Sequence, residues 1–206
     1  MAARAPAPLI LIPCRSLRSG KSRLAGILSE QQRHALCRDF LQRTLQLALQ
    51  VTSAGDIRLV SADTEAAILA AGLGIACMQD GNAGLNPALS QAVRLWHRQR
   101  GDFDAQTLLI LPIDLVNADA DAVQALLALP GDVALAPDLA EQGTNALRLT
   151  GRAAQDFRFQ FGEGSFAKHE IEAGRLGLRL NILRDARLGF DLDSPADHAA
   201  WAGRGI

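Results

Sequence analysis

The sequence predicts a single α/β domain built on a mostly parallel mixed sheet with helices on both faces. Short apolar segments typical of buried strands alternate with longer segments whose apolar residues recur at helical spacing. Such alternation indicates parallel strands joined by crossover helices. A length of 206 residues, a hydrophobic fraction of 49% and a formal net charge of −1 suit one soluble globular core.

Composition excludes several classes of protein. The nearly balanced charge gives no overall attraction to nucleic acid or to an anionic membrane. The apolar run Leu9–Ile12 is far too short for a signal peptide or a spanning helix. The three scattered cysteines, Cys14, Cys37 and Cys77, favour a reducing compartment over a disulfide framework. We therefore expect a cytoplasmic protein that binds neither nucleic acid nor membrane.

The first third of the chain predicts a loose terminus, a strand and a helix. Residues 1–8 are rich in Ala and Pro and have no periodic apolar face, so the folded domain is expected to span 9–206. Leu9–Pro13 is a short apolar run closed by proline, which is typical of a buried strand. Ser29 and Gln32 form a capping box, which predicts a helix running to about residue 50.

The remaining elements continue the alternation. The predicted strands are Ile57–Ser61, Gly74–Met78, Leu108–Leu111, Val133–Ala136, Ala146–Leu149, Phe157–Phe161 and Leu178–Leu183. The predicted helices are Thr64–Ala71 capped by Asp63, one started by Pro87 after the loop Gly81–Asn86, Ala120–Leu129, Ser165–Leu176, and a terminal helix capped by Ser194.

A basic loop follows the first predicted strand, at the edge where open α/β sheets bind ligands. Between Leu9 and Ser29 the chain has no acidic residue, and its basic residues are Arg15, Arg18, Lys21 and Arg23. Such a loop can hold a polyphosphate through its cations. The triplet Gly20-Lys21-Ser22 resembles part of a P-loop, but Arg15 stands where that motif requires a glycine. A solvated basic turn without a ligand is the alternative.

Carboxylates occur after one other predicted strand and at the start of the last segment. Asp114 lies just beyond Leu108–Leu111, and Asp191 and Asp193 flank Leu192 near the last segment. In extended backbone the last two carboxylates point to one face, where they repel each other unless a cation lies between them. Oxygen ligands without nearby His or Cys favour Mg²⁺. Alternatively, Asp191 caps a turn and Asp193 is an ordinary surface residue.

A third cluster consists of small and hydroxyl residues. Gly143-Thr144-Asn145 is followed later by Gly162-Glu163-Gly164-Ser165, which leads into a predicted helix. Backbone N–H groups and hydroxyls of such residues can bind a phosphate or a carboxylate, and a helix N-terminus favours an anion. Both stretches could also be simple turns. His169 lies one helical turn after Ser165, on the face toward this cluster.

Several short segments, taken in their order along the chain, form a specific set: Ile12-Pro13, Lys21-Ser22-Arg23-Leu24-Ala25, Gly84-Leu85-Asn86, Leu111-Pro112, Asp114-Leu115, Gly143-Thr144-Asn145-Ala146-Leu147, Phe161-Gly162-Glu163-Gly164-Ser165-Phe166 with His169, and Asp191-Leu192-Asp193. In these segments the sequence resembles the 2-phospho-L-lactate guanylyltransferase family, whose relatives act on phosphoenolpyruvate or 3-phosphoglycerate in the biosynthesis of coenzyme F(420). The resemblance spans about residues 9–197.

The resemblance implies a single-domain, Rossmann-like nucleotidyltransferase that uses GTP and a small phospho-acid. It implies Mg²⁺ at Asp114, Asp191 and Asp193, and the phospho-acid at Thr144, Gly162 and Ser165. For the GTP side it implies Pro13, Lys21, Gly84, Asn86 and Pro112, with Arg15 standing where the family usually has a lysine. The family also tends to have a proline soon after the carboxylate that corresponds to Asp114, and here Leu115-Val116-Asn117 follows instead.

The expected reaction is attack of an ionised phosphate oxygen of the acid on the α-phosphorus of GTP, with release of pyrophosphate. Lys21 and Arg23 are the expected catalytic cations, since alignment and charge neutralisation suffice when the nucleophile is already ionised. Alternatives are a molybdopterin-type or other nucleotidyltransferase, a GTP-binding regulator without catalysis, and a P-loop phosphohydrolase. A homodimer is the oligomer we consider.

Overall fold

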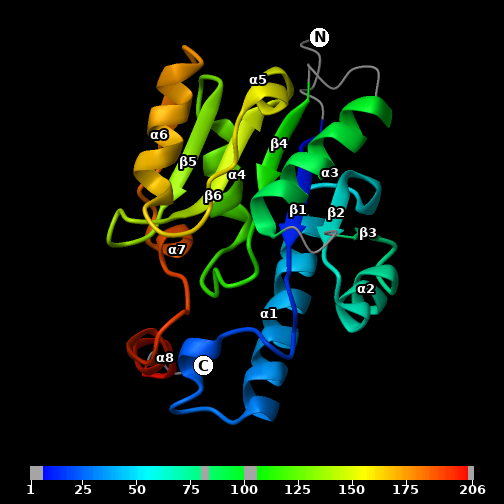
Figure 1. Cartoon of the computed structure of the whole chain (residues 1–206), viewed down its shortest axis with the longest axis vertical. Coiled ribbons are helices and arrows are strands. Elements are labelled where there is room, and N and C mark those ends of the chain that lie inside the picture. The colour runs from blue at the N-terminus through cyan, green and yellow to red at the C-terminus, as the bar shows by residue number, and fades with distance from the viewer. Residues whose placement is uncertain (1–6, 80–83, 100–105, 204–206) are drawn as a thin grey trace.

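The computed structural model describes residues 7–79, 84–99 and 106–203, and its strands form one mixed sheet in the order β3-β2-β1-β4-β6-β5-β7 (Figure 1). The strands are β1 Leu9–Pro13, β2 Ile57–Val60, β3 Ala76–Met78, β4 Thr107–Ile110, β5 Val133–Pro137, β6 Thr144–Thr150 and β7 Leu180–Ile182. Strand β6 is antiparallel to both of its neighbours, and the other pairs are parallel. The predicted mostly parallel mixed sheet is confirmed.

Helices cover both faces of the sheet, as predicted (Figure 1). They are α1 Glu30–Val51, α2 Thr64–Ala71, α3 Leu85–Gln99, α4 Ala120–Ala128, α5 Gly151–Asp156, α6 Ser165–Arg175, α7 Ala186–Gly189 and α8 Pro195–Ala202, with 3₁₀ turns η1 Ser22–Leu24 and η2 Ala54–Asp56. Residues of α1, α2, α4 and α7 pack on one face, and residues of α3, α5 and α6 pack on the other. Alternate residues of β1 serve the two faces: Ile10 and Ile12 face the first core, and Leu9 and Leu11 face the second.

Three predicted caps are confirmed at helix starts. The Ser29 hydroxyl accepts from the backbone N–H of Gln32 at 3.3 Å, and the Gln32 side chain accepts in return from the Ser29 N–H at 2.8 Å. Asp63 caps α2, and Ser194 caps α8. Within the described ranges, none of the helices combines the length and apolar character that a membrane crossing requires.

The structure corrects one strand. Phe157–Phe161 was predicted as a strand and is an irregular segment that follows α5, a helix that we did not predict. Its backbone N–H groups are bound by side chains instead of a neighbouring strand: those of residues 158, 160 and 161 donate to Glu172, His169 and Asn86. A segment whose donors are bound by side chains needs no β ladder.

Several boundaries also differ from the predictions. Helix α3 begins at Leu85, before Pro87, and α7 was not predicted. Residues 81–83 of the predicted loop and residues 1–6 of the predicted loose terminus lie outside the described residues.

A small third core joins the two ends of the chain. Leu24 from the early basic loop and Leu192 from the late acidic segment are both fully buried, in one cluster with Phe40 of α1 and Phe190. Trp201 of α8 packs on it, edge to face with Phe40 at 6.2 Å between ring centroids. Figure 1 shows α8 beside the early segment that leads into α1. This core therefore carries residues far apart in sequence to one place.

Candidate functional site

The candidate site lies where the order of the strands reverses, between β1 and β4. The chain leaves β1 toward β2 on one side and leaves β4 toward β5 on the other side, and the carboxyl ends of β1 and β4 at such a reversal are where open α/β sheets bind ligands. The loop after β1 carries Lys21, and the loop after β4 carries Asp114. The backbone N–H of Leu192 donates to the Asp114 carbonyl at 3.2 Å, which fixes the late acidic segment at the same edge.

Lys21 lies at the centre of this edge. Its ammonium donates to Asp114 Oδ2 at 2.7 Å and to Asp193 Oδ1 at 2.9 Å, and its side chain is 7% exposed. Arg23 approaches the other oxygen of Asp193 at 2.9 Å but is 75% exposed. The structure thus brings together the early cations and the late aspartates, as the sequence analysis expected.

The local backbone explains the position of Lys21. Lys21 has φ 52°, in the left-handed region that a residue with a side chain seldom occupies. A Cβ on the preceding Gly20 would lie 2.7 Å from Cys37 Sγ, so only glycine lets the loop approach α1 so closely. Gly20-Lys21-Ser22 therefore leads into the short turn η1, and its glycine is explained by packing on α1. This gives no support to the P-loop alternative.

The pKa values of Lys21 and Asp191 are both raised at this edge, for different reasons. Burial alone would lower the pKa of Lys21, but the carboxylates of Asp114 and Asp193 outweigh it and raise that pKa, so Lys21 stays charged. The pKa of Asp191 is raised, first by burial and then by the negative charges of Asp114 and Asp193. Asp191 accepts a hydrogen bond from the Asn145 amide at 3.3 Å. The three aspartates are therefore close enough to repel one another.

The predicted metal ligands have the right chemistry for Mg²⁺, but they are not arranged around a metal position. Asp114, Asp191 and Asp193 supply only oxygen atoms, which are the ligands that Mg²⁺ prefers, and a divalent cation would neutralise the repulsion among them. Within residues 7–79, 84–99 and 106–203, no group of three or more His, Cys, Asp or Glu side chains is already arranged to hold a metal. The Lys21 ammonium instead bridges two of the carboxylates.

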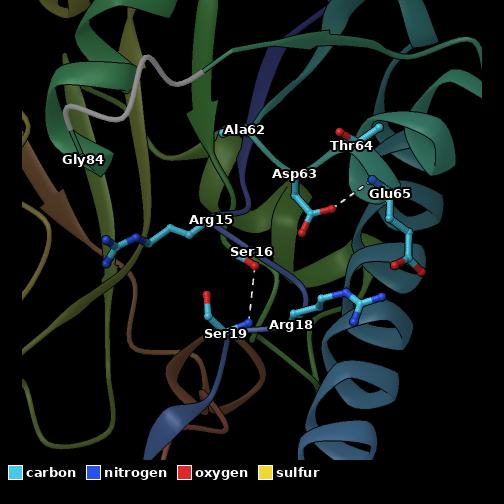
Figure 2. A pocket seen from close by; sticks show the side chains of 9 residues that line it. All are labelled: Arg15, Ser16, Arg18, Ser19, Ala62, Asp63, Thr64, Glu65 and Gly84. Atoms are coloured by element: carbon cyan, nitrogen blue, oxygen red, sulfur yellow. Dashed lines mark hydrogen bonds between the residues drawn. The ribbon is translucent and has the colours of Figure 1, made fainter.

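A cleft of about 600 Å³ opens beside this edge, along the same basic loop (Figure 2). Its lining includes Arg15, Arg18 and Gly84, together with Asp63 and Glu65 at the start of α2. Figure 2 shows the side chains of Arg15 and Arg18 extending in opposite directions from the loop. The N–H of Leu17 donates to Asp63 at 2.9 Å, so this aspartate both caps α2 and holds the loop. Two predicted nucleotide-binding residues, Arg15 and Gly84, therefore lie on one cleft.

The other predicted nucleotide-binding residues have mainly backbone or structural contacts here. Pro13 ends β1 and is buried, and Pro112 follows the residue after β4. The Asn86 side chain donates to the Phe161 carbonyl at 3.1 Å and accepts from its N–H at 2.8 Å, so it clamps α3 to the irregular segment before α6. Their role in binding GTP stays a prediction.

The predicted anion-binding residues do gather in one place. The backbone N–H of Thr144 donates to Ser165 Oγ at 2.8 Å, and His169 Nδ1 lies 2.9 Å from Thr144 Oγ1. Ser165 opens α6, and its N–H donates to the carbonyl of Gly162 at 3.0 Å. Gly162 has φ 120°, which glycine adopts without strain, and a Cβ there would meet no atom within 4 Å.

Sequence reasoning placed Asn145 in the third cluster but gave it no role in the site. It is 7% exposed, and its side-chain amide donates to the Leu188 carbonyl at 3.0 Å as well as to Asp191. In β6, Thr144 and Asn145 point to opposite faces of the strand, so one serves the hydroxyl cluster and the other serves the aspartates. The sequence could have indicated this role, because Asn145 directly follows Thr144 in the predicted anion-binding cluster.

Comparisons with known proteins agree on a family. A family model described as "Guanylyl transferase CofC like" matches residues 9–200. Proteins named phosphoenolpyruvate guanylyltransferase from Chloroflexus aggregans and Sphaerobacter thermophilus are each 39% identical, over 89% and 95% of this chain and 91% and 92% of their own. A 2-phospho-L-lactate guanylyltransferase from Haloterrigena turkmenica is 31% identical, over 86% of this chain and 76% of its own.

Solved structures agree on the fold. A protein from Desulfovibrio desulfuricans G20, assigned to the nucleotide-diphospho-sugar transferases, superposes with a TM-score of 0.72 at 15% identity, over 93% of this chain and 84% of its own. A nucleotidyl transferase from Methanothermobacter superposes with a TM-score of 0.62 at 14% identity, over 95% of this chain and 97% of its own. Such low identities establish the architecture alone.

Proposed function

This chain belongs to the family of CofC-like guanylyl transferases and is a nucleotidyltransferase, and from that premise we propose that it joins GMP from GTP to a small phospho-hydroxy acid, releases pyrophosphate and serves the biosynthesis of coenzyme F(420). Phosphoenolpyruvate is the acid we favour, because the relatives at 39% identity carry that name. The acids 2-phospho-L-lactate and 3-phosphoglycerate remain the alternatives.

One observation carries this proposal: Lys21 and Arg23 meet Asp114 and Asp193 at the switch point of the sheet. Cations from a basic loop suit a triphosphate, and a cluster of aspartates suits Mg²⁺. A site that holds both at one edge of the sheet has the charges that phosphoryl-type transfer requires.

In the proposed reaction, an ionised phosphate oxygen of the acid attacks the α-phosphorus of GTP. A new P–O bond forms, the bond from the α-phosphorus to the bridging oxygen of the β-phosphate breaks, and pyrophosphate leaves with that electron pair. The second phosphate pKa is about 6, so the nucleophile needs no general base at neutral pH. Lys21 and Arg23 would neutralise charge on the triphosphate, and the loop after β1 would align it.

Asp114, Asp191 and Asp193 would hold Mg²⁺, which would supply charge neutralisation at the α-phosphoryl group and at the leaving pyrophosphate. Since Lys21 bridges Asp114 and Asp193 in the structure described here, binding of a metal by these carboxylates would release the ammonium for the triphosphate. Thr144, Gly162 and Ser165 would bind the phospho-acid, and Arg15, Gly84, Pro13, Asn86 and Pro112 would line the nucleotide side.

The test is an assay of pyrophosphate release with GTP, Mg²⁺ and each of the three acids in turn. We expect release only when an acid is present, fastest with phosphoenolpyruvate, and slower release when ATP or CTP replaces GTP. Arg23→Gln should slow the reaction, whereas Arg179→Gln should not, because Arg179 is an equally exposed arginine beside a single aspartate near β7. Binding of GTP without pyrophosphate release would indicate a regulator instead, and release of inorganic phosphate without an acid would indicate a hydrolase.

A further inference from the structure

His169 is a buried polar residue to which the proposed reaction gives no role so far. It lies on α6 with 0% of its surface exposed. Its ring contacts the aromatic rings of Phe157 and Phe161, with centroids 5.6 and 5.0 Å away. Burial lowers its pKa to about 4, so the imidazole is neutral at physiological pH.

The hydrogen bonds of His169 define which ring nitrogen carries the proton. The backbone N–H of Gln160 lies 3.0 Å from Nε2, and a backbone N–H can only donate, so Nε2 must accept. In a neutral imidazole the proton is then on Nδ1. Nδ1 lies 2.9 Å from Thr144 Oγ1, so the imidazole donates this bond and the hydroxyl oxygen accepts it.

This direction determines what the two hydroxyls can offer a ligand. Thr144 Oγ1 accepts from His169, and Ser165 Oγ accepts from the Thr144 N–H, so the proton of each hydroxyl is left to point elsewhere. Among the residues that the structure describes, no hydrogen bond from either hydroxyl proton to a protein acceptor is found. Thr144 and Ser165 are 6% and 2% exposed, and a buried hydroxyl that lacks an acceptor is costly. An anionic acceptor placed beside both hydroxyls would satisfy their protons.

We propose that His169 is a positioning residue for the phospho-acid. Its Nδ1–H donates to a lone pair of Thr144 Oγ1, so the hydroxyl proton of Thr144 points away from the imidazole, toward a phosphate or carboxylate oxygen of the acid. This inference rests on the proposed function, because it assigns the acid to the cluster of Thr144 and Ser165. His169 itself need not touch the acid.

Two substitutions separate the two hydrogen bonds of the imidazole. In His169→Asn the side-chain amide takes the place of Nδ1 and can donate to Thr144, but nothing accepts from Gln160. In His169→Gln the longer side chain can accept from Gln160 but presents no donor to Thr144. Ala173→Gly is the control, because it weakens the same helix at a buried position without altering a polar contact.

The experiment measures the KM for phosphoenolpyruvate and for GTP, and the Kd of phosphoenolpyruvate alone, for the full chain and these variants. We expect His169→Gln to raise the KM and Kd for the acid about tenfold or more, the size of one hydrogen bond to a charged group. His169→Asn should keep both within about threefold, and the KM for GTP should stay unchanged throughout. Equal losses in the Asn and Gln variants, or a loss in Ala173→Gly as large as in His169→Gln, would overturn the inference.

A measurement on the unaltered protein covers the case in which both variants unfold. ¹⁵N NMR of the His169 ring should show a proton on Nδ1 and none on Nε2, whereas a proton on Nε2 would overturn the inference. Failure of the proposed function would appear differently, as an unaltered protein that releases no pyrophosphate with any acid.

Discussion

Replacement of Lys21 by Met is the sharpest perturbation of the candidate site. It removes one ammonium that lies 2.7 and 2.9 Å from two carboxylates, while the methionine retains most of the apolar volume of the side chain. Replacement of Arg23 by Met is the matched control, because it removes a cation from the same loop that contacts only Asp193.

The burial of the two cations sets the magnitudes. Removing one partner of a fully buried ion pair costs about 3–5 kcal/mol, because the other charge is left uncompensated. The side chain of Lys21 is 7% exposed, but those of Asp114 and Asp193 are 28% and 40% exposed, so water recovers part of that cost. We therefore expect Lys21→Met to lower the free energy of unfolding by about 2 kcal/mol. Arg23, 75% exposed, should contribute less than about 0.5 kcal/mol.

Mg²⁺ should reverse the loss of stability in Lys21→Met. In Lys21→Met no ammonium competes for Asp114 and Asp193, so a divalent cation should bind the three aspartates more tightly than in the unaltered protein. Urea unfolding, followed by the fluorescence of Trp96 and Trp201, measures both effects with and without Mg²⁺. Equal stability of Lys21→Met and the unaltered protein, or an equal gain of both from Mg²⁺, would refute this reasoning.

Three further predictions concern single residues. Asp191→Asn should lower the rate of pyrophosphate release roughly a hundredfold or more without loss of stability, because it removes a metal ligand and relieves repulsion; a near-normal rate would contradict this. Because the folded-state pKa of His169 lies below its unfolded value, stability should be retained above pH 6.5 and fall toward pH 4, by about 3 kcal/mol relative to His169→Asn; parallel pH profiles in urea unfolding would contradict this. Ser29→Ala should cost about 1 kcal/mol through loss of the capping box of α1, and an unchanged thermal midpoint would show that the cap contributes nothing.

Much of the fold could be predicted because its signals are local. Helix α2 runs from Thr64 to Ala71 under the Asp63 cap, as predicted, since both the cap and the apolar spacing lie within a few residues of each other. The prediction of a strand over Phe157–Phe161 was wrong, because alternating aromatic residues are typical of a strand but do not determine one. Side chains distant in sequence, such as that of Glu172, bind its N–H groups in place of a neighbouring strand.

The site could be predicted in outline for a topological reason. Parallel strands present their carboxyl ends at one edge, so Lys21 after β1 and Asp114 after β4 meet there. Asp193 follows α7 and is brought to the same edge by the packing of Leu192 with Leu24. The finer arrangement depends on packing that no local pattern encodes. Examples are the bridging position of the Lys21 ammonium between two aspartates and the donor role of His169 toward Thr144.

A crystal structure with Mg²⁺ and a GTP analogue that cannot be cleaved would test most directly whether the early basic loop and the late aspartates form one nucleotide site. We predict a metal held by Asp114, Asp191 and Asp193, with the Lys21 ammonium moved to the triphosphate. A nucleotide bound elsewhere, with Lys21 still bridging Asp114 and Asp193, would contradict the account.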